Sequence, residues 1–160
     1  MKLPVVLCIA AVGACSHAAA PTAGVAVVTR VVDGDTIDVA IGDRDERVRL
    51  LGIDTPEIHV EGGPPECFGP EAADHTSSLL PPGTEVRLER DVVGRDHYGR
   101  LLAHVYRLTD GLLVNEELLR RGYARPLTIE PNHVFAQRYV AATVAAEADG
   151  LGLWSACTGR

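Results

Sequence analysis

The pattern of apolar and polar positions predicts five short β-strands. The first two are runs of β-branched residues separated by the turn-like Asp33-Gly34-Asp35, and the third follows a polar hairpin signal at residues 42–45. The last two alternate between apolar and polar side chains, as strands with one buried face do. The expected strands are residues 24–32, 36–41, 47–53, 84–93 and 101–108.

Three helices are expected between and after these strands. Pro70 suits the first position of a helix, and Pro81-Pro82-Gly83 stops that helix. Gly122 ends the second, and Asn132 is expected to cap the third. The predicted helices are residues 70–80, 114–122 and 133–149. The order β-β-β-α-β-β-α-α favours an α+β domain built on a five-stranded OB-fold β-barrel with three helices.

Length and composition agree with one globular domain. The chain has 160 residues, of which 46% are hydrophobic and 23% charged, which is typical of a folded protein. Only 4% are aromatic, so Val, Leu, Ile and Ala should build the core. We expect the domain to span residues 24–157.

The first residues read as a targeting segment. Lys2 precedes an apolar run and then small residues, which is the pattern of a signal peptide over residues 1–20. Val12-Gly13-Ala14-Cys15 also resembles a bacterial lipobox, which would place a lipid on Cys15. The sequence leaves both alternatives open. In either case we expect an exported protein, secreted or lipid-anchored on the outer face of the cell membrane.

Cysteine usage supports export. Cys8 and Cys15 lie in the leader, so Cys67 and Cys157 are the two that remain in the domain. In an oxidising compartment these two can form a disulfide, and the alternative is two free thiols. Their spacing does not match that of a zinc site.

The net charge limits how a polyanion could bind. The chain carries a formal charge of −7, and removing residues 1–20, which contain Lys2 and no acid, makes it −8. Proteins that bind nucleic acid through bulk electrostatics are basic. A polyanionic substrate would therefore need local arginines or a bound cation.

Acidic and basic residues gather after neighbouring strands. Asp33 and Asp35 follow the first strand, and Asp54 and Glu57 follow the third. Carboxylates at the ends of adjacent strands can converge on a hard cation, which prefers oxygen ligands. Taken alone, each of these segments is more often a turn.

Arginines complete the pattern. Arg49 lies on the third strand and Arg100 in the loop before the fifth. Two guanidinium groups beside a cation would form a clamp for phosphate.

Three motifs together resemble one known family. VVDGDTI, RLLGIDTPE and DHYGR, in this order and spacing, are similar to the staphylococcal nuclease (thermonuclease) family. The resemblance runs from Val28 to Trp154 and includes the later LVNEELLRRGYA and GLW segments.

The resemblance implies a metal site. The calcium ligands of the family fall on the side chains of Asp35 and Asp54 and on the backbone carbonyl of Thr55. Asp33 matches a nearby supporting acid. The implied cofactor is Ca²⁺.

The resemblance also implies catalytic residues. Glu57 matches the glutamate that activates or positions the attacking water. Arg49 and Arg100 match the phosphate-binding arginines, and Tyr98 matches a tyrosine that touches the substrate phosphate.

Two segments depart from the family pattern. Leu127 and Ile129 stand where tyrosines flank the nucleotide, so base stacking worth about 1–3 kcal/mol is lost there. The lysine-rich loop that follows Asp-Thr-Pro-Glu in the family is neutral to acidic here, at residues 58–69. The acidic charge of the whole domain is a third departure, and all three should weaken substrate binding more than the chemical step.

The function implied by the resemblance is a calcium-dependent nuclease that hydrolyses phosphodiester bonds of DNA, RNA or both to 3′-phosphate products, acting as a monomer. The alternative is a non-catalytic OB module that binds nucleic acid or a protein partner. A calcium-stabilised envelope lipoprotein is a third interpretation. The enzyme is favoured because every acid and arginine of the family site is retained.

Overall fold

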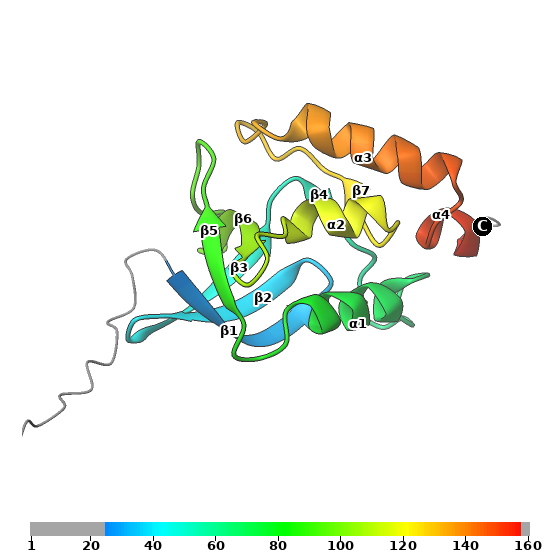
Figure 1. Cartoon of the computed structure of the whole chain (residues 1–160). Helices are drawn as coiled ribbons and strands as arrows, with labels where there is room; N and C mark the ends of the chain where they lie inside the picture. Colours follow the sequence, from blue (N-terminus) through cyan, green and yellow to red (C-terminus); the bar gives the residue numbers. More distant parts are fainter. Residues whose placement is uncertain (1–24, 158–160) are drawn as a thin grey trace, which may run out of the picture.

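A computed structural model describes residues 25–157 and contains a closed barrel with four helices beside it (Figure 1). The strands follow the order β1-β2-β3-β6-β5, and every pairing is antiparallel except the parallel pairing of β3 with β6. This confirms the predicted α+β class and OB-fold barrel. The barrel strands are β1 (Val25–Asp33), β2 (Thr36–Ile41), β3 (Arg44–Leu50), β5 (Glu85–Glu89) and β6 (Leu101–Arg107).

The interior of the barrel is aliphatic, as the composition predicts. Alternate residues of each strand point inward because successive side chains of a strand lie on opposite faces. On β3, for example, Val48 and Leu50 are fully buried in the core, whereas Arg47 between Glu46 and Val48 is exposed. Tyr139 is the one aromatic side chain among the buried residues of the core cluster in the described part of the chain.

The helices gather on one side of the barrel in Figure 1, with α3 at the top. α2 contacts both β6 and α3, and α1 contacts β1. A short fourth helix, α4, was not expected from the sequence. The helices are α1 (Gly69–Leu79), α2 (Val114–Arg120), α3 (Ala136–Ala148) and α4 (Leu153–Ala156).

Several predicted boundaries were wrong, among them the ends of the strands predicted at residues 47–53 and 84–93, which finish at Leu50 and Glu89. β3 begins at Arg44 and not at Arg47, because the two residues Gly42 and Asp43 suffice for the hairpin turn. α3 begins at Ala136, and Asn132 does not cap it. Instead, the Asn132 side chain accepts a hydrogen bond from the Val93 N–H (2.7 Å) and donates one to the Val93 carbonyl (3.1 Å).

A second, two-stranded sheet lies outside the barrel. β4 (Ile53–Asp54) pairs with β7 (Arg125–Pro126), and the turn that leads into β4 contains Gly52 with φ of 78°. A Cβ at Gly52 would lie 2.5 Å from ring carbons of Tyr139, so only glycine fits this turn. The packing of α3 on the turn thus fixes where β4 begins.

The disulfide and the limits of the described residues concern the predictions about export. The structure joins Cys67 to Cys157 in a disulfide that spans 90 residues. The predicted signal peptide and Cys15 lie outside the described residues. Within residues 25–157, no helix is both long enough and apolar enough to span a membrane.

Asn115 ties α2 to the barrel. Its side chain is completely buried, donates a 2.8 Å hydrogen bond to the Leu51 carbonyl and accepts one of 2.8 Å from the Val105 N–H. These two backbone groups belong to the segment after β3 and to β6, so one amide satisfies both.

We expect Asn115→Ala to lower the free energy of unfolding by about 2–4 kcal/mol, because it leaves two buried backbone groups unpaired. Chemical denaturation followed by circular dichroism measures this loss. Gln137→Ala removes the same group from an exposed position on α3 and should change stability by less than about 0.5 kcal/mol. Equal losses in the two variants would contradict the role assigned to Asn115.

Candidate active site

Four acidic residues, Asp33, Asp35, Asp54 and Glu57, form what we term the acidic cluster. Asp33 is the last residue of β1, and Asp35 lies in the tight turn before β2. Asp54 is the last residue of β4, and Glu57 follows in the irregular segment before α1. The hydrogen bond from the Leu50 N–H to the Asp35 carbonyl (2.9 Å) draws the end of β3 towards this turn.

Asp35 is the most deeply placed member of the acidic cluster, with 4% of its surface exposed. Its carboxylate accepts hydrogen bonds from the Thr55 N–H and the Thr36 hydroxyl, each at 3.0 Å. Burial raises the pKa of Asp35 above its ordinary value, and the Arg49 guanidinium opposes that shift. The site therefore holds a buried carboxylate whose charge is only partly compensated.

Arg49 links two members of the acidic cluster. Its Nη2 lies 3.1 Å from Asp35 and 2.9 Å from Asp54, while only 7% of the residue is exposed. Its Nη1 donates hydrogen bonds to the carbonyls of Leu50 (2.9 Å) and Ile53 (2.8 Å). The guanidinium is thus fixed on four acceptors, and both carboxylates converge on one point.

Small residues allow the two loops to approach. A Cβ at Gly34 would lie 2.6 Å from Oγ1 of Thr55, so glycine is required where the β1–β2 turn meets the Thr55 segment. The Thr76 hydroxyl of α1 donates a 2.6 Å hydrogen bond to the Gly34 carbonyl and holds the turn from the other side. Thr55 Oγ1 is buried and has no hydrogen-bond partner within residues 25–157.

Glu57 forms a carboxyl pair with Asp33. The Glu57 carboxyl donates a hydrogen bond to the Asp33 carboxylate, and this bond, together with partial burial and the charges of Asp33, Asp35 and Asp54, raises the pKa of Glu57 to about 7. A carboxylate with a pKa near neutrality can act as a general base.

Arg100 and Tyr98 lie in the loop before β6. Asp96 organises this loop, because its carboxylate accepts hydrogen bonds from the Arg100 Nε (2.7 Å) and from the N–H groups of Tyr98 (3.0 Å) and Arg100 (2.9 Å). The Arg100 guanidinium lies 5.4 Å from the centre of the Tyr98 ring, which is 74% exposed.

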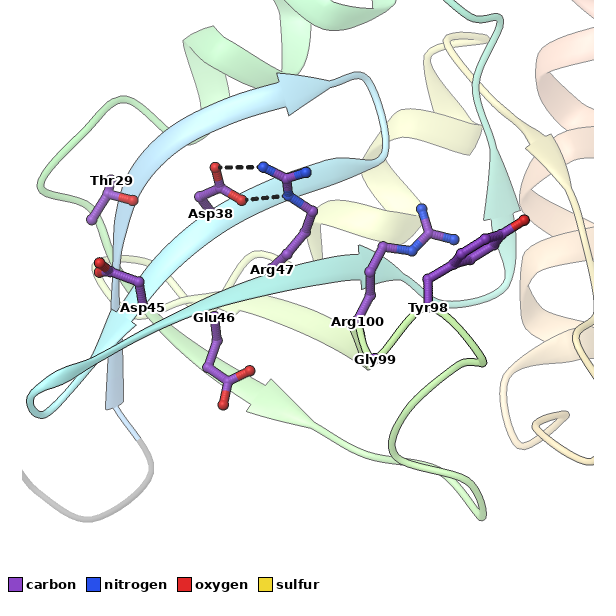
Figure 2. A pocket seen from close by; sticks show the side chains of 8 residues that line it. All are labelled: Thr29, Asp38, Asp45, Glu46, Arg47, Tyr98, Gly99 and Arg100. Carbon is purple, nitrogen blue, oxygen red and sulfur yellow. Dashed lines mark hydrogen bonds and ion pairs between the residues drawn. The ribbon is translucent and has the colours of Figure 1, made fainter.

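An open cleft of about 980 Å³ runs from this pair along the outer face of the barrel (Figure 2). Figure 2 shows Arg100 and Tyr98 beside the end of β3, and Arg47 turned towards Asp38 of β2 further along the sheet. The members of the acidic cluster are not among the residues that line this cleft.

The predicted site residues therefore form two groups. Asp35, Asp54, Thr55 and Arg49 contact one another directly, and Glu57 joins them through its charge and through Asp33. Among the described residues, no hydrogen bond or ion pair links Arg100 or Tyr98 to the acidic cluster. Val48 of β3 pairs with Leu101 of β6 in parallel, so Arg100, just before Leu101, lies beside β3, the strand that carries Arg49.

The donor set suits a hard cation. Across residues 25–157, no three His, Cys, Asp or Glu side chains are arranged as a complete metal cluster. The converging groups are two carboxylates, with the Thr55 backbone beside Asp35. Oxygen donors of this kind fit Ca²⁺, which takes about 6–8 oxygen ligands and would need further oxygens from water or substrate.

The segment with Leu127 and Ile129 borders the acidic cluster. β7 pairs Arg125 with Asp54, and the Leu127 N–H donates a 3.0 Å hydrogen bond to the Gly52 carbonyl. Leu127 is 40% exposed, so an aliphatic side chain stands beside β4.

Two acidic residues that support the site were missed in the sequence. The carboxylate of Asp96 binds the Arg100 side chain. It also accepts a hydrogen bond from the N–H of Tyr98, two residues later, and an aspartate in this position is a turn signal that could have indicated its role. Glu66 binds the backbone of Glu57 across the intervening loop, and nothing in the local sequence marks that contact.

Comparison with known proteins identifies the family. The family described as staphylococcal nuclease homologue matches residues 47–156. A thermonuclease of Staphylococcus hyicus is 37% identical over 128 residues, which cover 80% of this chain and 74% of that protein. Endonuclease YncB of Bacillus subtilis is 38% identical over 128 residues, covering 79% of this chain and 59% of that protein. This chain therefore belongs to the family of staphylococcal nuclease homologues.

Proposed function

We propose that this domain is an exported, calcium-dependent hydrolase that cleaves phosphodiester bonds of DNA, RNA or both and leaves 3′-phosphate ends. Membership of the family and likeness to a thermonuclease and an endonuclease support nuclease chemistry in general. The observation that carries the proposal is the convergence of Asp35 and Asp54 on Arg49, within hydrogen-bond distance of one guanidinium nitrogen.

Asp35, Asp54 and the Thr55 carbonyl are the groups that would hold Ca²⁺. When bound, this ion would supply positive charge against the phosphate oxygens of the transition state. The chain itself carries a net negative charge of −7, so a polyanion gains little from bulk attraction.

The remaining residues divide the chemical work. Glu57 would accept a proton from water at its carboxylate, and water attack with cleavage of the P–O5′ bond leaves the phosphate on the 3′ side. Arg49 would stabilise a phosphate oxygen through its positive charge beside the carboxylates, and Arg100 would add a charged donor from the loop before β6. Tyr98 offers an exposed hydroxyl beside Arg100.

A non-catalytic OB module is the alternative that the first experiment excludes or supports. Such a module needs neither a glutamate whose pKa is raised to about 7 nor a guanidinium buried on two aspartates. Digestion of single-stranded and duplex DNA and of RNA, with Ca²⁺ or with a chelator, followed by identification of the ends, separates the two functions.

The first prediction concerns the metal. Asp35→Asn and Asp54→Asn should each lower activity by at least about 10²-fold at limiting Ca²⁺, because a hard-cation site loses one of its two carboxylates. Isothermal titration should show weaker Ca²⁺ binding in both variants. Asp149→Asn, an exposed change at the end of α3, is the control and should match the parent. Parental cleavage by either site variant would overturn the assignment of the metal ligands.

The second prediction concerns Glu57. Glu57→Gln should lower kcat by about 10²–10⁴-fold, because the base that accepts the proton is lost. It should also raise the melting temperature in chelator at about pH 8, since a carboxyl whose folded pKa is raised costs stability once it ionises.

The sign of this pH dependence is fixed. Between the ordinary pKa of a glutamate and about 7, the folded protein holds the Glu57 proton more tightly than the unfolded chain does. The stabilisation is complete below the ordinary value and disappears as pH rises through about 7. The difference between Glu57→Gln and the parent should therefore shrink towards about pH 4. A difference independent of pH would contradict the shifted pKa.

The third prediction separates chemistry from binding. Arg100→Ala should lower kcat by about 10²-fold, the cost of losing one donor to a charged transition state. Leu127→Tyr should instead strengthen substrate binding by up to about 1–3 kcal/mol if stacking is regained. This gain would lower KM and leave kcat nearly unchanged.

Steady-state kinetics on a short single-stranded substrate measure both effects. Arg120→Ala removes an exposed arginine from α2, away from the site, and serves as the control for net charge. An unchanged KM in Leu127→Tyr together with a purely raised KM in Arg100→Ala would show that these segments do not flank the substrate.

A further inference from the structure

Glu57 is held by a second acidic residue across a loop. The Glu57 N–H donates a 3.0 Å hydrogen bond to Oε2 of Glu66, and the Glu66 N–H donates a 2.8 Å hydrogen bond to the Glu57 carbonyl. The backbone of Glu57 is thus engaged on both sides by one residue. We term this pair of hydrogen bonds the Glu57–Glu66 bracket.

The start of α1 closes over the bracket. The Gly69 N–H donates a 3.0 Å hydrogen bond to the Glu66 carbonyl. A Cβ at Gly69 would lie 2.6 Å from the Glu57 carbonyl oxygen, so the backbone here passes directly against Glu57. The bracket is therefore packed against the first turn of α1, although the side chains of Glu57 and Glu66 are exposed.

A covalent bond anchors the next residue. Cys67 follows Glu66 in the chain and forms the disulfide with Cys157, the residue after α4. Phe68 then adopts a left-handed backbone with φ of 72°, and its ring centre lies 5.3 Å from that of Tyr123. The chain after Glu66 is thus joined to the C-terminal part of the domain.

The chain enclosed by the bracket has little to fix it. Residues 59–66 are exposed, and residues 62–65 read Gly-Gly-Pro-Pro. An exposed loop of this kind samples many conformations. The Glu57–Glu66 bracket closes the base of this loop, so movement of the loop does not displace Glu57.

We propose that Glu66 is a positioning residue for Glu57, and that the Cys67–Cys157 disulfide holds Glu66 in place for that purpose. The inference rests on the proposed role of Glu57 as the base. A reacting group displaced by about 1 Å can lose up to about 10²-fold in rate, so a contact that fixes the Glu57 backbone affects kcat without touching substrate.

The test compares five variants with the parent. Glu66→Ala removes the acceptor, whereas Glu66→Gln keeps a side-chain oxygen able to accept the Glu57 N–H. Glu61→Gln removes the same charge from an exposed position of the same loop. The double variant Cys67→Ser with Cys157→Ser removes the anchor, and Val86→Ala, a core truncation in β5, controls for loss of stability.

Kinetics are measured well below the lowest melting temperature of the set. Glu66→Ala and the double cysteine variant should lose about tenfold or more in kcat, with KM changed by less than about twofold. Glu66→Gln should recover most of the loss, and Glu61→Gln and Val86→Ala should match the parent. A parental kcat in Glu66→Ala would overturn the inference and leave the proposed function intact.

A double-mutant cycle shows whether Glu66 acts through Glu57. In a Glu57→Gln background, Glu66→Ala should cause no further loss, because there is no base left to position. A second loss of about tenfold in that background would overturn the inference.

Hydrogen exchange decides the inference without reference to activity. The Glu57 amide should exchange at least about tenfold faster in Glu66→Ala and in the double cysteine variant than in the parent. Unchanged exchange would overturn the bracket. If the parent cleaves no nucleic acid, the proposed function fails, and this measurement still decides whether Glu66 holds Glu57.

Discussion

The buried guanidinium of Arg49 is the interaction on which the site depends. A charge removed from water is costly unless it is fully paired, and Arg49 is paired with two carboxylates and two backbone carbonyls. Those partners come from the β1–β2 turn, from the end of β3 and from β4. One side chain of the barrel therefore holds β4, which lies outside the barrel, against the β1–β2 turn.

Pairing extends to the other arginines near the cleft. Arg47 is bound to Asp38, Arg95 to Glu46 and Arg100 to Asp96. The positive charges of these three arginines are thus each neutralised by a neighbouring carboxylate. Binding of a polyanion would require exchange of partners, with phosphate taking the place of Asp96 at Arg100, and this exchange reduces the gain in affinity. Such an arrangement favours selectivity for a correctly placed phosphate over general attraction to polyanions.

Much of the site could be predicted because its residues sit at strand ends. The turn at Asp33 and Asp35 and the segment that begins at Asp54 are local features, and neighbouring strands bring them together in any barrel of this topology. The aliphatic core followed in the same way from the alternation of Val, Leu and Ile. Contacts between segments far apart in sequence could not be predicted, because each depends on the orientation of a loop. The Asp33–Glu57 hydrogen bond, the attachment of Asn132 to Val93 and the Glu57–Glu66 bracket are of this kind.

The pairing of Arg49 with Asp35 and Asp54 has a consequence for where the protein can mature. In many small metalloproteins the ligands repel one another until the ion arrives, so folding waits for metal. Here the Arg49 guanidinium already offsets part of the negative charge on the two carboxylates. In the function proposed above, the polypeptide would reach its final structure without calcium, and the calcium concentration around it would set its activity and not its folding. Such an enzyme would stay inactive during synthesis and become active where calcium is plentiful.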